Sequence, residues 1–214
     1  LVFICDPNNP TGNRVGAAAI VEALTRANPE TYVAVDEAYW EFNLGEAGEA
    51  AMTVAGLIAH YPSLIVLRTM SKAFALAGAR LGFALAGRET AARLEVVRMA
   101  FNVNSLSMAV AEVVLNEADY VRDVVARVID GRRRLTAGLA GIAGLSPLPS
   151  WTNFVLVGTV RPAAEVAKAL ADRGVRVRLF PDVRLSNHFR ISVGRPEELD
   201  QCLEALSDVM EGDS

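Results

Sequence analysis

Short apolar segments alternate with helical segments through the first half of the chain, and this alternation limits the folds that the chain can adopt. The strand-like segments are residues 1–5, 31–35, 64–68 and 81–86. Helical patterns lie between them, at residues 17–26 and 50–60. Strands that alternate with helices favour an α/β fold with a mainly parallel sheet.

The second half of the chain shows a different pattern. Residues 90–139 are largely helical, with an interruption around residues 102–105. Beyond Pro149 the expected elements are strands at 153–157, 174–179 and 189–193 and helices at 163–173 and 196–210. These shorter strands predict a second, smaller α+β domain at the C-terminal end. We place the domain boundary so that residues 1–108 form part of a large domain and residues 109–214 form the small one.

The composition argues against several classes of function. Hydrophobic residues make up 52% of the 214 residues and the net charge is -4, which favours a folded core and no nucleic-acid surface. No apolar run reaches 18 residues, so we expect no membrane span. Cys5 and Cys202 are best interpreted as buried free thiols of a cytosolic protein, so we expect a cytoplasmic location. The two cysteines and two histidines lack the spacing of metal ligands, so we expect no metal site. The chain opens at Leu1 on a strand-like run without an initiator Met, which predicts a missing upstream part.

Polar residues follow the first three strand-like segments. They are Asn9 after the first segment, Asp36 and Tyr39 after the second, and Thr69, Ser71 and Lys72 after the third. Arg80 lies just before the fourth strand-like segment. If the first three strands are parallel, these residues lie at one edge of the sheet, where α/β folds bind ligands.

These residue types suit one kind of ligand. An amine beside hydroxyls and an arginine can form a Schiff base while its neighbours hold a phosphate. A carboxylate can pair with a protonated pyridine nitrogen, and a phenol and an amide can donate hydrogen bonds to a ring oxygen. Each residue alone is more often a turn residue, a helix cap or a surface charge. Their joint placement at three strand ends therefore carries the prediction.

Three motifs occur in order along the chain: DPNNPTG at residues 6–12, VDEAY at 35–39 and RTMSKAFALAGARLG at 68–82. With these motifs the chain resembles the fold-type I aminotransferases (class I/II), which depend on pyridoxal 5'-phosphate (PLP), over essentially its whole length. Within that family it is most similar to the histidinol-phosphate aminotransferases, because of YWEF at 39–42 and FNVNS at 101–105. The resemblance implies that the family's N-terminal part is absent here.

The resemblance assigns roles to the candidate residues. Lys72 would bond covalently to PLP and move a proton between the substrate α-carbon and the cofactor. Asp36 would face the pyridine nitrogen. The remaining cofactor contacts would be Asn9 and Tyr39 at the ring hydroxyl and Thr69, Ser71 and Arg80 at the phosphate.

For the substrate, the resemblance implies that Arg190 binds an anionic group, with Arg178 and Asn9 near the same subsite. A planar guanidinium suits a carboxylate or a phosphate through paired hydrogen bonds. A surface position without function is nearly as plausible an interpretation for Arg178. One departure from the family pattern is Ala75, which stands where glycine is usual and could stiffen the loop after Lys72.

The activity implied by the resemblance is transamination between glutamate/2-oxoglutarate and a second amino compound, histidinol phosphate, by a homodimer. Three alternatives stay open at this point. The first is another PLP enzyme of the same fold, such as an aromatic aminotransferase or a threonine-phosphate decarboxylase. The second is a PLP-sensing domain of a transcription regulator, and the third is a fragment without activity.

Overall fold

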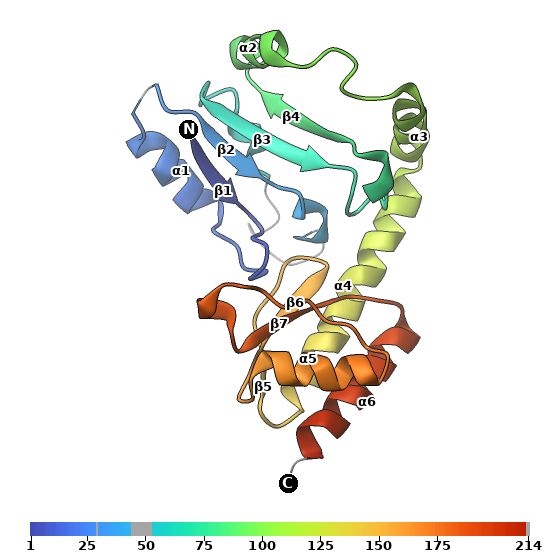
Figure 1. Ribbon diagram of the computed structural model, residues 1–214. Helices are drawn as coiled ribbons and strands as arrows, with labels where there is room; N and C mark the ends of the chain where they lie inside the picture. Colours follow the sequence, from blue (N-terminus) through green and yellow to red (C-terminus); the bar gives the residue numbers. More distant parts are fainter. Residues whose placement is uncertain (29, 44–52, 213–214) are drawn as a thin grey trace. The chain divides into compact units, whose positions relative to one another are not determined.

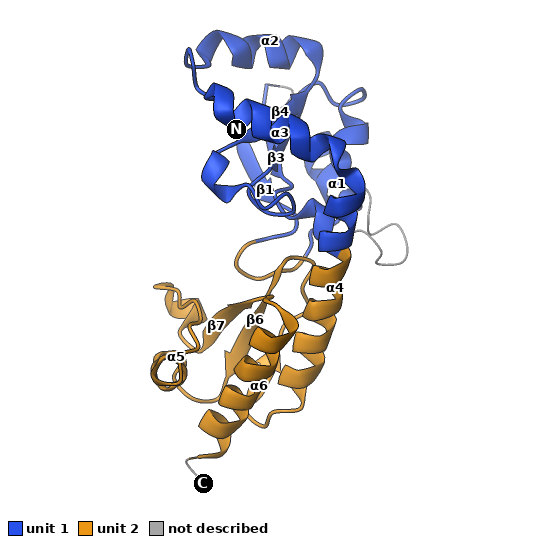
Figure 2. Cartoon of the chain, turned by 90° about the vertical axis from the view of Figure 1, so that its right-hand side faces the viewer, with its two compact units in different colours: residues 1–8, 14–125 blue, residues 9–13, 126–214 orange. Residues whose placement is uncertain are grey.

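The chain forms two compact units in a computed structural model that describes residues 1–28, 30–43 and 53–212 (Figure 2). Unit 1 consists of Leu1–Asn8 and Arg14–Val125, and unit 2 of Asn9–Asn13 and Ala126–Ser214. The units divide inside helix α4 (Ala118–Ala140), whereas the boundary expected at residues 108/109 falls within α3 (Ser105–Asn116). The division into a large and a small domain therefore stays a prediction.

Unit 1 is built on a four-stranded sheet of order β1-β2-β3-β4 (Figure 1). Its strands are β1 (Val2–Cys5), β2 (Val33–Asp36), β3 (Leu64–Thr69) and β4 (Gly82–Ala86). The first three run parallel, and β4 runs antiparallel to β3. Residues 70–81 contain only the short 3-10 helix η4 (Ala77–Ala79), so no crossover helix brings the chain back for a fourth parallel strand. The mainly parallel α/β fold is confirmed.

The core of unit 1 lies between this sheet and helix α1 (Ala17–Arg26). Alternate strand residues face the helix, as expected for side chains that change sides at each position. The buried residues are Val33, Val35, Leu64 and Val66 of the strands and Ile20 and Leu24 of the helix. Asp6 joins the end of β1 to the start of α1, because its Oδ1 accepts a hydrogen bond of 2.7 Å from Val15 N.

The helix expected at residues 50–60 is not an α-helix where the structure describes it. Residues 53–60 contain the 3-10 helix η3 (Val54–Leu57), and residues 50–52 lie outside the described part. Thr53 caps the start of η3, because its hydroxyl oxygen accepts a hydrogen bond from Ala55 N. Buried Val54 packs into the core, so a single turn suffices to close this side of the sheet.

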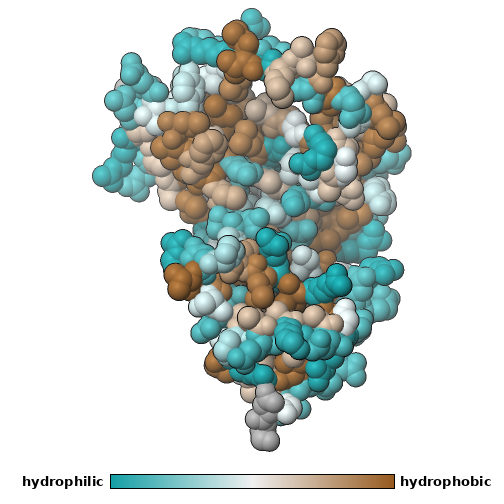
Figure 3. All heavy atoms as spheres, in the orientation of Figure 1, coloured by the Kyte–Doolittle hydropathy of each residue, from teal (hydrophilic) through white to brown (hydrophobic). Residues whose placement is uncertain are grey.

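The expected long helical region consists of three helices, α2 (Arg88–Val97), α3 and α4, with the break before α3 running over residues 98–104 and a second at Glu117. Large apolar side chains stay exposed on unit 1, where Figure 3 shows them at the surface. On α2, α3 and the segment between them they are Val96, Val97, Met99, Phe101, Leu106 and Leu115. No part of the chain that the structure describes covers these side chains. No helix of the described residues is long and apolar enough to cross a membrane.

Unit 2 is a three-stranded antiparallel sheet with helices on one face. Its elements are β5 (Leu145–Pro147), β6 (Phe154–Thr159), α5 (Ala163–Asp172), η5 (Val183–Leu185), β7 (His188–Ser192) and α6 (Pro196–Glu211). The side chains that share its core are Val155, Val157, Phe189 and Ile191 from the strands, and Leu135, Leu170 and Leu206 from the helices. Burial raises the pKa of the Cys202 thiol in this core to about 11, so the thiol is neutral and unreactive at neutral pH.

The strand expected at residues 174–179 is wrong. Only one residue pair of this segment, Arg178 with Arg190, joins the ladder, as an isolated antiparallel bridge. Gly174, with φ +81°, starts the segment and Pro181, which has no N–H to donate, follows it closely. The segment therefore meets β7 at a single pair and forms no further rungs.

The turn that contains residues 9–13 packs on unit 2. Trp151 N donates a 2.9 Å hydrogen bond to the carbonyl of Gly12, whose φ is +78°. A Cβ at this position would lie 2.6 Å from Ser150 Oγ, so only glycine fits both the conformation and the space. The glycine of the DPNNPTG motif is thus explained by a close approach of two backbones.

Candidate functional site

Two of the candidate residues end neighbouring parallel strands on the same face of the sheet. Asp36 is the last residue of β2, and Thr69 is the last of β3. Because Val35 and Val66 face α1, the alternation of side chains directs Asp36 and Thr69 to the opposite face. The Asp36 carboxylate is half-buried, and its Oδ1 accepts a 3.0 Å hydrogen bond from Ala38 N.

Lys72 lies three residues beyond the end of β3 with its side chain exposed. Its Nζ is 5.3 Å from the centroid of the buried Tyr39 ring. Within the described ranges no carboxylate forms an ion pair with Lys72. The amine is therefore accessible, and it lies over an aromatic ring rather than in a salt bridge.

Hydroxyl and guanidinium groups surround the same loop. Ser71 N donates to Thr69 Oγ1 at 3.1 Å, which keeps the two hydroxyl side chains in one tight turn. Arg80 is exposed and its Nη1 donates to the carbonyl of Ala77 at 3.0 Å. Hydroxyls and a guanidinium are suitable donors to a phosphate. With the Lys72 amine and the Asp36 carboxylate, the chemistry of this set fits PLP.

The candidate residues of unit 2 also come together. Arg190 Nη1 donates a 2.7 Å hydrogen bond to Asn9 Oδ1, and the guanidinium lies over the Phe154 ring, 4.6 Å from its centroid. Arg178 is bonded to Arg190 through both backbone groups, at 3.0 and 2.9 Å. In such a pair the two side chains lie on the same face of the sheet. Asn9, Arg178 and Arg190 therefore form one cluster, while the other six candidates belong to unit 1.

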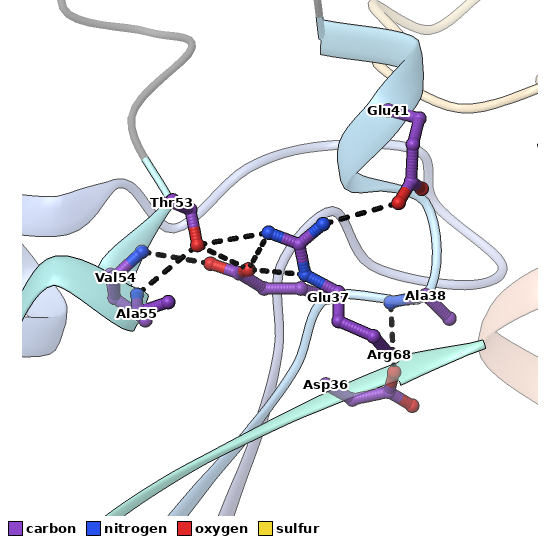
Figure 4. A network of polar contacts seen from close by, with 8 residues as sticks. All are labelled: Asp36, Glu37, Ala38, Glu41, Thr53, Val54, Ala55 and Arg68. Atoms are coloured by element: carbon purple, nitrogen blue, oxygen red, sulfur yellow. Dashed lines mark hydrogen bonds and ion pairs between the residues drawn. The ribbon is translucent and has the colours of Figure 1, made fainter. Parts of the chain in front are cut away.

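A buried ionic network lies behind Asp36 and Thr69, on the face of the sheet that carries α1 (Figure 4). Arg68 Nε and Nη2 are both 2.8 Å from Glu37 Oε2. Thr53 Oγ1 donates to the same carboxylate oxygen at 2.7 Å and accepts from Arg68 at 2.9 Å. Val54 N donates to the second oxygen of Glu37 at 2.9 Å. Every oxygen of this buried carboxylate thus has a partner.

Two further side chains complete the surroundings of Arg68. Its Nη1 is 3.1 Å from Glu41 Oε1, and its guanidinium carbon is 4.2 Å from the centroid of the Trp40 ring. Burial raises the pKa of the Glu41 carboxyl above its usual value, and the nearby Arg68 only partly counteracts this shift. Arg68 is therefore shared between two carboxylates. Both oxygens of Glu37 have hydrogen-bond partners, whereas burial disfavours the charged form of Glu41.

Neither Glu37 nor Arg68 carried an expected function, although each adjoins a predicted residue. Figure 4 shows Asp36 pointing away from the network that contains its neighbour Glu37. The sequence does contain a signal for this network. Alternate residues of each strand are apolar up to Val35 and Val66, and the next positions in the same alternation, Glu37 and Arg68, are charged. By fixing Glu37 to Arg68, the network fixes the ends of β2 and β3 relative to each other.

The comparisons with known proteins agree with this chemistry. The family model of class I and II aminotransferases matches residues 1–206. The chain belongs to this family. Among relatives, "Histidinol-phosphate aminotransferase 1" of Mannheimia succiniciproducens is 42% identical over 212 residues, covering 98% of this chain and 56% of the relative. The corresponding enzyme of Symbiobacterium thermophilum is 40% identical over 206 residues, with 96% and 55% covered.

The solved structures give the same result for the fold. The histidinol-phosphate aminotransferase of Sinorhizobium meliloti, determined in complex with PLP, has a TM-score of 0.88 at 31% identity and covers 100% of this chain. This chain in turn spans 58% of that structure, and about half the length of the curated relatives it matches. The predictions of a class I/II aminotransferase family, of its fold and of PLP as the cofactor are confirmed.

Replacing Arg68 by alanine tests the importance of the network for stability. The change leaves the Glu37 charge buried without its partner, which should cost about 3–5 kcal/mol of unfolding free energy. Urea denaturation of the full-length protein measures this cost. The control is R26A, which removes an exposed pair with Glu22 on α1 and should cost less than about 0.5 kcal/mol. Equal losses in the two variants would contradict the role of the network.

Ala75 provides a second test, because its backbone has a conformation that glycine adopts more readily than alanine. Its φ is +56°, a conformation in which a Cβ costs energy and a glycine does not. We expect A75G to raise the unfolding free energy by about 0.5–1 kcal/mol in thermal or urea denaturation. A77G, in the same loop at an exposed residue with ordinary φ, should lower it instead. A loss of stability in A75G would contradict the claim that Ala75 is strained by its positive φ.

Proposed function

We propose that the full-length protein is a PLP-dependent aminotransferase that exchanges an amino group between glutamate/2-oxoglutarate and histidinol phosphate or its keto form. The observation that supports this most is Lys72. Its amine is exposed, lies over Tyr39 and has no carboxylate partner among the described residues, just beyond the strand end that adjoins Asp36. A surface lysine without function would not require this surrounding set of side chains.

Each candidate site residue of unit 1 has a proposed role in the reaction. When bound, PLP supplies a ring that accepts electrons from the substrate α-carbon. Lys72 Nζ would bond covalently to it and later carry the proton that leaves the α-carbon. The Asp36 carboxylate would hold a proton on the ring nitrogen, and Tyr39 would donate to the ring oxygen. Thr69, Ser71 and Arg80 would bind the phosphate.

The cluster in unit 2 supports an anionic substrate. Arg190 and Arg178 present two guanidinium groups on one face, and Asn9 orients the first of them through its amide oxygen. A carboxylate or a phosphate is the ligand that two such groups bind best. Histidinol phosphate carries such a group, and the relatives in Mannheimia succiniciproducens and Symbiobacterium thermophilum are named for it.

Two further proposals concern the oligomeric state of the protein and its location in the cell. A homodimer is supported by the exposed apolar side chains of α2, α3 and the segment between them, which favour contact with another protein surface. A cytoplasmic location is proposed as the usual place of amino-acid biosynthesis.

The covalent role of Lys72 can be tested on the full-length protein. With PLP the protein should become yellow, and borohydride should fix the cofactor on a peptide that contains Lys72, as mass spectrometry detects. K72A should lose this adduct, and its turnover should fall by at least about 100-fold because it lacks the acid/base group. K168A, which removes the other lysine of the printed sequence, should keep both the borohydride-fixed adduct and the turnover. An adduct that persists in K72A would show that the assignment is wrong.

The substrate is tested by comparing kcat/KM values for several amino donors with 2-oxoglutarate as the acceptor. We expect the highest value for histidinol phosphate, and lower values for phenylalanine and for threonine phosphate. In the assay with threonine phosphate, released CO2 is measured as well, because a decarboxylase of the same fold would produce it. If phenylalanine were preferred, or if threonine phosphate released CO2 at the higher rate, the proposed substrate would be wrong.

A further inference from the structure

One arginine of unit 1 pairs with two buried carboxyl groups (Figure 4). The distances are 2.8 Å from Arg68 Nη2 to Glu37 Oε2 and 3.1 Å from Arg68 Nη1 to Glu41 Oε1. None of the three side chains is more than 10% exposed. If both carboxyls were ionised, the three side chains would together carry one excess negative charge. Burial disfavours such a charge, so the cluster favours the uptake of one proton.

Glu37 has no room for this proton. Its Oε2 faces Nε and Nη2 of Arg68 and the Thr53 hydroxyl, and its Oε1 accepts a hydrogen bond from Val54 N. The Thr53 oxygen itself accepts from Arg68 and from Ala55 N, so its own hydrogen is directed at Glu37. A hydrogen on either oxygen of Glu37 would therefore meet a donor. Glu37 is thus the ionised carboxyl of the cluster.

Glu41 has room for a proton on one oxygen. Its Oε1 faces Arg68, whereas its Oε2 is buried and has no hydrogen-bond partner among the described residues. Burial raises the pKa of the Glu41 carboxyl, and its own backbone N–H and the Arg68 guanidinium lower the pKa without cancelling this rise. The charge of Glu37 raises the pKa further. Arg68 and Glu37 are the charged groups that face Glu41 within the described ranges, since Asp36 points away from the network.

We propose that Glu41 is a pH-sensitive positioning residue that takes up a proton on Oε2 while an exposed carboxyl is still ionised. With this proton the cluster is neutral, and Arg68 balances one anion, Glu37. Without it two anions compete for the same guanidinium, and the excess charge weakens the pairing that fixes the ends of β2 and β3. The proton on Glu41 therefore stabilises the strand ends that place Asp36 and Thr69.

The raised pKa of Glu41 sets the direction of the pH dependence. Because the folded state favours the protonated form, the stabilisation is complete below 4.5, the usual pKa of this carboxyl, and is lost as the pH rises through the folded-state value. E41Q keeps the shape of the protonated carboxyl and never ionises. In thermal denaturation of the full-length protein, its Tm should lie about 2 °C above that of wild type at about pH 8. The difference should shrink as the pH falls toward 4.5.

Two control variants separate this effect from a loss of contacts. E37Q neutralises the carboxylate that faces only donors, so it should lower the Tm by at least about 4 °C over the same pH range. E22Q neutralises an exposed carboxylate on α1 and should shift the Tm by less than about 1 °C. The proposal would be overturned if E41Q lost stability as E37Q does, or if its difference from wild type did not change with pH.

Infrared spectroscopy detects the proton directly, through the C=O stretch of a neutral carboxyl. Subtracting the spectrum of E41Q from that of wild type isolates the band of Glu41. This band should appear as the pH falls, with a midpoint above 4.5. A midpoint at or below 4.5 would overturn the proposal.

Amide hydrogen exchange tests whether the proton acts on the strand ends. Val54 N donates to Glu37, so the protection of this amide reports on the network around that carboxylate. At about pH 8 the Val54 amide should exchange about 3–5-fold faster in wild type than in E41Q, whereas the amides of β6 in unit 2 should exchange at equal rates. Equal rates at Val54 would show that Glu41 does not position the strand ends.

Discussion

The geometry of unit 1 depends on one buried ion pair, between Arg68 and Glu37. A charged pair in a core is stable only when each group has hydrogen-bond partners, and here Thr53 and Val54 supply those of the carboxylate. Because the partners come from β2, β3 and the start of η3, the pair can form only in one register. Strand alternation then converts that register into the placement of Asp36 and Thr69 on the opposite face. The network thus orders the candidate site without contacting its ligand.

Unit 2 places an arginine, Arg190, on the face of its sheet that lies away from the core. Its sheet buries alternate residues of β7 against α5 and α6 and leaves the other face to Arg190. The guanidinium stacks on Phe154 and donates a hydrogen bond to Asn9, so an aromatic ring and a neutral amide help to hold it in place. The contact with the ring face stabilises the cation and fixes the direction of the guanidinium.

Much of this could be predicted from the sequence, because hydrophobic periodicity sets local structure. The helix at residues 17–26 has the expected bounds, and the ends of β2 and β3 bear the expected polar residues. The strand at 174–179 failed because alternating Val and Arg look the same in a strand and in an extended segment with one bridge. The pairing of Glu37 with Arg68 could not be predicted from the sequence either, since it depends on which residues of β2 and β3 lie side by side.

The loop after β3 shows how strain and order coexist near Lys72. Ala75 and Arg80 both have positive φ, and each conformation costs energy for a residue with a Cβ. The backbone bonds of buried Met70 oppose this cost, since its N–H donates to Leu81 at 3.1 Å and its carbonyl accepts from Leu76 at 2.9 Å. These bonds enclose the segment that carries Lys72 and do not involve the Ala75 side chain. A glycine at position 75 would therefore relieve strain while the backbone that presents the lysine stays where it is.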